Sequence, residues 1–114
     1  MEVAADRFEE LVGEALDDLP EEFLRAMDNV VVLVEDRHDE EPDLLGLYDG
    51  VALTERTGDY GGVLPDRITL YREALAECCA DEEELREEVA VTVVHEIAHH
   101  FGIDDETLHR LGWG

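Results

Sequence analysis

The chain of 114 residues has the usual size of one domain, and its hydrophobic share of 45% is enough for a single modest core. It has 32 acidic residues against 8 basic ones, all of them arginine, so the formal net charge is -24. Such a surface repels the phosphates of nucleic acids and anionic lipids. We therefore expect one domain over residues 1–114, with neither nucleic acid nor a membrane as a partner.

The acidic residues are spread along the whole sequence instead of being gathered in one segment. An acidic surface without lysine keeps a protein soluble in concentrated salt, where screening weakens the repulsion between like charges. The alternative is that the charge attracts basic substrates. We favour the solubility interpretation, because the charge is distributed along the chain.

The beginning of the chain and its cysteines indicate the cellular compartment. Residues Met1–Arg7 are acidic and amphipathic, and they lack the basic start and the apolar stretch of a secretory signal. Cys78 and Cys79 are neighbours, so a bridge between them would be strained, and they lack the C-x-x-C spacing of a metal site. We expect two free thiols in a cytoplasmic protein.

The N-terminal part of the chain predicts two helices and a strand. Apolar residues recur at helical spacing over residues 5–19, and Pro20 begins a second short helix that reaches Met27. The continuous and mostly β-branched run Val30–Val34 is typical of a buried strand. Charged residues and a proline then predict a loop over residues 35–43.

The middle of the chain predicts the rest of a small sheet. Leu44–Tyr48 has the composition of a strand, Asp49-Gly50 that of a hairpin turn, and Val51–Thr54 that of the partner strand. Residues 55–66 are rich in glycine and predict an irregular stretch. Arg67–Tyr71 alternates between polar and apolar residues and predicts another strand.

The C-terminal part predicts helices. A short helical segment over residues 73–79 precedes Asp81, which we expect to cap a long helix over residues 82–101 with the help of the acidic residue three positions later. Gly102 ends this helix, and residues 104–111 form a last turn or short helix. The order of these elements predicts an α+β domain with helices against one face of a small mixed sheet.

The long helix carries the pattern His95-Glu96-x-x-His99. Residues four apart on a helix lie one turn above each other, so the two imidazoles can converge on one point, as two corners of a tetrahedral zinc site do. Glu96 points beside that position, where it can take a proton from a water molecule that the metal has acidified. We therefore predict His95 and His99 as zinc ligands and Glu96 as general base.

A zinc site that hydrolyses its substrate needs a third protein ligand and keeps the fourth position for water. Because Gly102 breaks the helix, the chain can turn and bring Asp105 back to the metal. Asp104 and Glu106 are rival ligands, and we favour Asp105. Apolar residues surround the motif in the sequence, and burying its polar groups without a metal would cost several kcal/mol, in round terms about 2 to 7 for each group.

With this pattern in place, the sequence resembles the small zincin-like metallopeptidase family of prokaryotes. The similar segments are Leu45–Tyr48, Leu53–Arg56, Leu64–Thr69 and Thr92–Asp105. The resemblance implies a minimal zincin fold, with a mixed sheet and an active-site helix, and a zinc peptidase. The pattern with Asp105 last also looks like the aspartate variant of the metzincins. Their methionine turn has no counterpart here, and Leu111 and Trp113 are candidates for the floor of the site.

Three functions are compatible with these residues. We favour a zinc-dependent peptidase acting on peptides or proteins. The alternatives are a zinc-binding interaction or regulatory module that hydrolyses nothing, and a metallohydrolase for a non-peptide amide. The sequence leaves open the substrate, the oligomeric state and the donor that stabilises the oxyanion, for which the candidates are Tyr48, Tyr60, Tyr71, Arg67 and His109.

The remaining expectations concern the surroundings of the site. His100 follows His99 and points about 100° away from it, so we expect it behind the ligands or on the surface. His38 lies in a charged loop and should be solvated. A peptide substrate would add to a sheet edge, either Arg67–Tyr71 or Val51–Thr54, over a shallow site.

The acidic composition predicts that salt stabilises the fold. The Debye length falls from about 10 Å at 0.1 M salt to about 3 Å at 1 M, so self-repulsion among the carboxylates weakens over this range. The melting temperature, followed by circular dichroism, should therefore rise markedly from low to molar sodium chloride. A flat melting temperature would contradict the solubility interpretation and favour a local use of the charge.

Overall fold

The structure, a computed structural model, describes residues 1–50 and 65–110, apart from the side chains of Ala26, Phe101 and Asp105. Its helices are α1 (Ala5–Asp17), α2 (Glu21–Ala26), α4 (Arg72–Glu77), α5 (Glu82–Phe101) and α6 (Asp105–Arg110). Its strands are β1 (Val30–Glu35), β2 (Gly46–Asp49) and β3 (Asp66–Tyr71). Within these ranges, no helix is both long and apolar enough to cross a bilayer.

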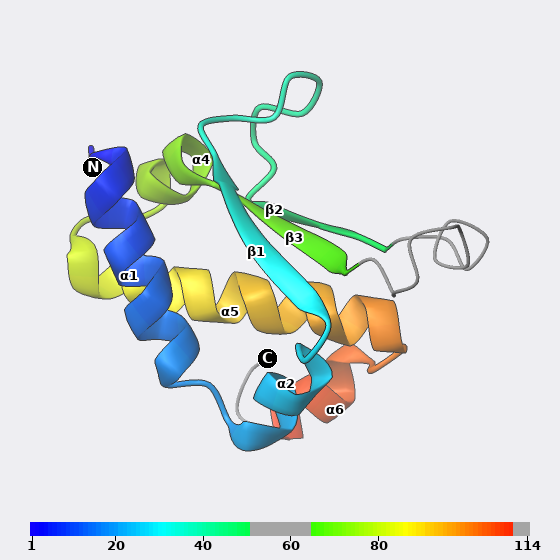
Figure 1. The fold of residues 1–114 in the computed structure, drawn as a ribbon. Helices are drawn as coiled ribbons and strands as arrows, with labels where there is room; N and C mark the ends of the chain where they lie inside the picture. The colour runs from blue at the N-terminus through cyan, green and yellow to red at the C-terminus, as the bar shows by residue number, and fades with distance from the viewer. Residues whose placement is uncertain (51–64, 111–114) are drawn as a thin grey trace.

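The strands form one mixed sheet in the order β1-β3-β2. β1 runs parallel to β3 with Val32 opposite Ile68, and β2 runs antiparallel to β3 with Tyr48 opposite the same residue. The helices lie on one side of this sheet, and α5 passes beneath it (Figure 1). The predicted α+β architecture, with helices against one face of a small mixed sheet, is confirmed.

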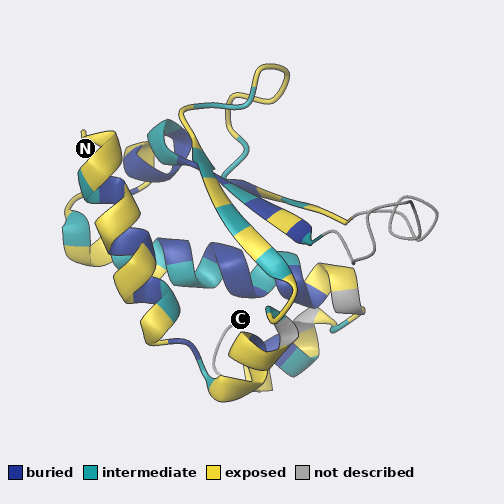
Figure 2. Cartoon of the chain, in the orientation of Figure 1, coloured by how far each residue is buried: buried dark blue, intermediate teal, exposed yellow. Residues whose placement is uncertain are grey.

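The core lies between the inner face of the sheet, α1 and α5. Helix α1 buries one stripe, made of Phe8, Leu11, Val12 and Ala15, because apolar residues three and four apart share a face. This stripe packs against α5, whose buried residues include Leu85, Val89 and Val93. Burial is concentrated along these facing surfaces, while the far sides of the helices are exposed (Figure 2).

The strand predictions need correction in two places. The first strand is not buried on both faces, since Val31 and Leu33 are 39% and 44% exposed. No described helix covers the outer face of β1, which is also an edge strand of the sheet. The predicted strand 67–71 is β3 and occupies the centre of the sheet, so it cannot offer a free edge to a peptide. The other predicted edge, Val51–Thr54, lies outside the described residues.

The remaining described elements agree with the predictions, with ends that shift by a few residues, except that Asp49, predicted in a hairpin turn, is the last residue of β2. The strand predicted over residues 44–48 begins at Gly46, and the helix predicted over residues 5–19 ends at Asp17. Both cysteines are free, as predicted, with Cys78 exposed and Cys79 buried. Burial is the main cause that raises the pKa of the Cys79 thiol to about 11, which keeps this thiol protonated at neutral pH.

Both ends of α5 follow from the local sequence, as predicted. The Asp81 side chain accepts a hydrogen bond from the backbone N–H of Glu84 at 2.9 Å, which satisfies one of the free donors of the first turn. Gly102 follows the last turn with a φ of 74°, a left-handed conformation that a residue with a side chain rarely adopts. The helix that carries the motif therefore starts and stops where its own residues require.

Removing the cap of α5 should destabilise the fold without changing its site. Asp81→Ala should lower the free energy of unfolding by about 1 kcal/mol, because the Glu84 N–H loses its acceptor. Urea denaturation should show a lower midpoint with an unchanged slope. Asp81→Asn is the matched control, since its amide oxygen can still accept this bond, and it should unfold near the wild-type midpoint. An unchanged midpoint for Asp81→Ala would show that the cap contributes nothing.

Candidate functional site

The three motif residues lie on α5 as predicted, on the side that meets the segment leading into β2. His95 and His99 are one helical turn apart, and their ring centroids are separated by 6.4 Å. His95 and Glu96 are half-buried and His99 is exposed. Because a zinc-bound imidazole nitrogen lies about 2.1 Å from the ion, two rings at this separation can reach one ion between them.

An open groove of about 420 Å³ runs along this part of α5. One wall is the segment from Asp43 to Gly46, which leads into β2, and the other wall is α5. The α5 residues that line the groove are Glu88, Val91, Thr92, His95, Glu96 and His99. The three motif residues thus share one open groove, as expected for a shallow site.

The strand β2 approaches α5 closely beside this groove. A Cβ atom at Gly46 would lie 2.7 Å from Cγ2 of Thr92, so any other residue would force Thr92 or the strand to shift. Two residues further on, the backbone N–H of Tyr48 donates a hydrogen bond to the Glu96 carboxylate. The close approach therefore brings a main-chain donor to the side chain predicted as general base.

The environment of Glu96 shifts its acidity. Burial raises the pKa of its carboxyl group above the usual value, and the charge of His99, the N–H of Tyr48 and the charge of His95 oppose this shift in part. A carboxylate with a raised pKa accepts a proton more readily, as a general base must. The direction of the shift agrees with the role predicted for Glu96.

The motif is only partly buried, since His95 and Glu96 are half-buried and His99 is exposed. The apolar residues of α5 that surround it in sequence turn towards the core, where Val93, Val94 and Ile97 are fully or almost fully buried. The polar residues turn towards the groove, because the helical period separates the two sets. The cost of burying His99, which is exposed, is therefore no argument for a metal.

The candidates for the third ligand lie just beyond α5, at the start of α6. Asp105 is the first residue of α6, and its side chain lies outside the described part of the structure. The rival ligand Asp104 is engaged within its own loop, because Oδ1 of Asp104 accepts a hydrogen bond from the backbone N–H of Thr107 at 2.8 Å. Hydrogen bonds from Thr107 lower the pKa of the Asp104 carboxyl group. Glu106 is exposed on α6. Among the described side chains, no three from His, Cys, Asp and Glu lie together so that they could hold a metal ion.

The described oxyanion candidates do not line the groove. Tyr48 donates its hydroxyl to Asp66, and Arg67 pairs with Asp49 at 2.7 Å. Tyr71 is buried at the other end of β3, and His109 is exposed on α6. Tyr60, like Leu111 and Trp113, falls outside the described residues.

His100 is exposed, as predicted, whereas the prediction for His38 needs correction. His38 is not merely solvated, because its Nδ1 accepts the backbone N–H groups of Glu40 and Glu41 and its ring lies edge-on to Tyr71 at 5.5 Å. His100 stacks on Tyr48, with ring centroids 4.0 Å apart. Asp66 is a further polar residue of this region, and its burial was not predicted, since a single aspartate at the start of a strand carries no signal that it is buried.

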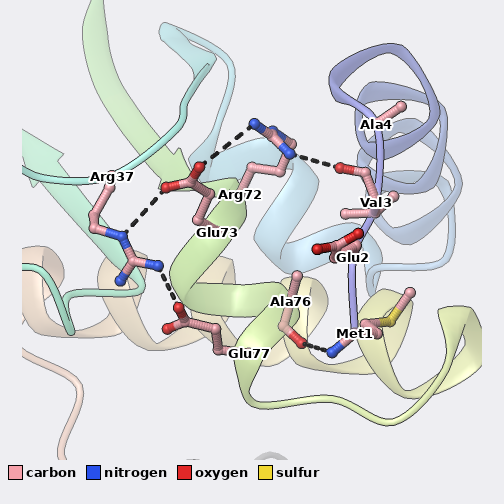
Figure 3. Close-up of a pocket in the computed structure, with 9 residues that line it drawn as sticks. All are labelled: Met1, Glu2, Val3, Ala4, Arg37, Arg72, Glu73, Ala76 and Glu77. Atoms are coloured by element: carbon pink, nitrogen blue, oxygen red, sulfur yellow. Dashed lines mark hydrogen bonds and ion pairs between the residues drawn. The ribbon is translucent and has the colours of Figure 1, made fainter.

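A larger hollow of about 610 Å³ lies away from the motif, between the N-terminal segment and α4 (Figure 3). Its two guanidinium groups already have partners within the chain. Arg37 bonds Glu73 and Glu77, and Arg72 donates to the Val3 carbonyl at 2.6 Å. These bonds hold the N-terminal segment and the loop after β1 onto α4, so the hollow has a structural explanation.

Comparison with known proteins places the chain in a family. Residues 27–113 match the family described as zincin-like metallopeptidase. The solved structure of a conserved hypothetical protein from Thermo thermophilus is 28% identical to the chain. The likeness has a TM-score of 0.60 and covers 87% of this chain and 94% of the other. None of the curated proteins matches. The match extends over most of the chain, including β1, β3 and the motif helix, and the chain therefore belongs to the zincin-like metallopeptidase family.

Proposed function

We propose that the protein is a zinc-dependent peptidase that hydrolyses peptide bonds, with Glu96 as general base. The observation that carries the proposal is that His95, Glu96 and His99 line the same open groove. The family membership supports it, since the matched region includes this whole motif. We also propose the cytoplasm as its location, where thiols such as its two free cysteines stay reduced.

The ligands of the proposed site are His95, His99 and Asp105. Two imidazoles and one carboxylate are a donor set that zinc accepts, and they leave the fourth position open. A bound zinc ion supplies an acidified water molecule and a Lewis acid for the carbonyl group. The two histidines of this donor set support the assignment, because they lie on the same wall of the groove with ring centroids 6.4 Å apart.

Glu96 provides the proton transfers. Its carboxylate takes the proton from the attacking water and passes it to the nitrogen of the leaving amine. The Tyr48 N–H holds this carboxylate at the wall of the groove, and partial burial raises its pKa. Both features favour a side chain that is held ready to accept a proton.

The open groove fits an extended peptide better than a compact small molecule. Its lining combines apolar side chains, Leu44, Leu45 and Val91, with the polar motif. The net charge of -24 disfavours acidic peptides as substrates, because the whole surface repels them. A protein or peptide without many acidic residues is therefore the substrate class that we propose.

The ligand assignment predicts the zinc content of variants. Wild-type protein should bind about one zinc ion per chain, and His95→Ala or His99→Ala should abolish binding, because each variant leaves too few donors. Asp105→Ala should weaken binding by a smaller factor, since both histidines remain. Elemental analysis after dialysis measures this, with His38→Ala, whose side chain does not line the groove, as the control. Unchanged zinc in both histidine variants would exclude this site.

The role of Glu96 predicts a variant that keeps its metal and loses its activity. Glu96→Gln should retain zinc and the fold but hydrolyse a peptide library about 10² to 10⁴ times more slowly, because a neutral amide cannot take the proton. Mass spectrometry of a broad library provides the rates, with Glu87→Gln on the exposed side of α5 as the matched control.

The same measurement separates the competing functions. Equal cleavage by the wild type and Glu96→Gln would contradict the general base. No cleavage by a zinc-loaded wild type would favour a zinc-binding module without hydrolysis. Cleavage of non-peptide amides alone, again dependent on Glu96, would redirect the proposal to that substrate class.

A further inference from the structure

Beside the groove, three side chains from three elements meet: Tyr48 of β2, Asp66 of β3 and His100 of α5. The Tyr48 hydroxyl donates a hydrogen bond to Oδ2 of Asp66 at 2.7 Å. The Tyr48 ring stacks on the His100 ring, with centroids 4.0 Å apart and planes 17° from parallel. Nε2 of His100 lies 3.8 Å from the same Oδ2 of Asp66. We call these three residues the Tyr48 cluster.

Asp66 is the fixed member of the Tyr48 cluster. It is only 7% exposed, although a buried carboxylate is costly unless it is paired or hydrogen-bonded. It begins the central strand, and its backbone N–H donates to the Asn29 carbonyl at 2.9 Å. Its position is therefore set by the middle of the sheet, and its carboxylate accepts a hydrogen bond from the Tyr48 hydroxyl.

Tyr48 links this fixed point to the site. Its hydroxyl reaches Asp66, while its backbone N–H donates to the Glu96 carboxylate. The strand continues close to α5, since a Cβ atom at Gly50 would lie 3.2 Å from Cε1 of His100. One residue thus connects the central strand, the last turns of α5 and the proposed general base.

We propose that the Tyr48 cluster positions Glu96, by fixing the place of β2 against the last turns of α5. Tyr48 and Asp66 are positioning residues, because neither lines the groove and the Tyr48 hydroxyl is engaged by Asp66. His100 completes the cluster as a stacking surface. The positioning role rests on the proposed function of Glu96. The contact between β2 and α5, which the positioning role requires, is independent of that function.

The first test measures the contact itself, in metal-free protein. Tyr48→Phe keeps the ring and removes only the hydroxyl that reaches Asp66. The amide of residue 48 should then exchange its hydrogen at least about tenfold faster, because β2 opens more often from α5. Amides that join β1 to β3 should keep their wild-type rates. Tyr71→Phe is the matched control, since it removes the same atom at the other end of β3.

The second test asks whether the bond between Tyr48 and Asp66 is responsible. Asp66→Asn retains an oxygen that can accept from the hydroxyl, so it should preserve protection of the residue 48 amide better than Asp66→Ala does. In the double variant Tyr48→Phe with Asp66→Ala, the residue 48 amide should exchange no faster than in the single variant with the faster exchange. The reason is that both substitutions remove the same hydrogen bond. Should Asp66→Ala not fold, Tyr48→Phe and Asp66→Asn still decide.

The third test concerns catalysis. On a peptide that the wild type cleaves, Tyr48→Phe should lower kcat about tenfold while its zinc content stays that of the wild type. Tyr71→Phe should leave kcat unchanged, even where it lowers the melting temperature as much as Tyr48→Phe does, or more. A fall in kcat that merely follows the loss of stability in both variants would overturn the positioning role.

The outcomes for the Tyr48 cluster and for the peptidase can be told apart. Wild-type exchange of the residue 48 amide in Tyr48→Phe would overturn the proposal, whatever the protein hydrolyses. Faster exchange in a protein whose wild type cleaves nothing would support the cluster as the anchor of β2 and contradict the peptidase. Faster exchange with unchanged kcat would overturn the positioning of Glu96.

Discussion

The packing of β2 against the groove side of α5 is the contact on which the rest of the site depends. The opposite side of the helix is anchored in the core by residues such as Leu85, Val89 and Val93, so its position is settled by burial of apolar surface. Gly46 permits this close approach without a shift, since it has no side chain to collide with Thr92. This approach creates the groove and delivers the Tyr48 N–H to Glu96.

A small number of arginines pair with carboxylates of the acidic chain and so join separate elements. Arg7 forms two hydrogen bonds with the Glu82 carboxylate, at 2.9 and 3.0 Å, and so links α1 to the first turn of α5. Arg72 similarly joins α4 to Asp36 and to the N-terminal segment. With 32 acidic side chains and 8 arginines, most carboxylates must rely on solvent and counterions.

Near the motif, the polar groups are arranged in two layers. The motif residues face the groove, where a metal ion and a peptide can reach them. Behind them, Tyr48, Asp66 and His100 contact one another, and the Tyr48 hydroxyl donates to the buried carboxylate of Asp66 at the start of the central strand. A polar cluster with its bonds satisfied has one preferred geometry, which suits a group that must be aimed.

The sequence by itself determined what depends on neighbours along one helix. The motif spacing, the Asp81 cap and the stop at Gly102 were all predictable, because residues within a few positions of each other decide them. It could not determine which strand lies in the centre, that β1 is open on one face, or that Asp66 is buried. These features arise from pairings between segments far apart in the chain, such as Tyr48 with Asp66 and Gly46 with Thr92. Only the tertiary structure brings such partners together, because their register is set by the packing of the whole sheet on α5.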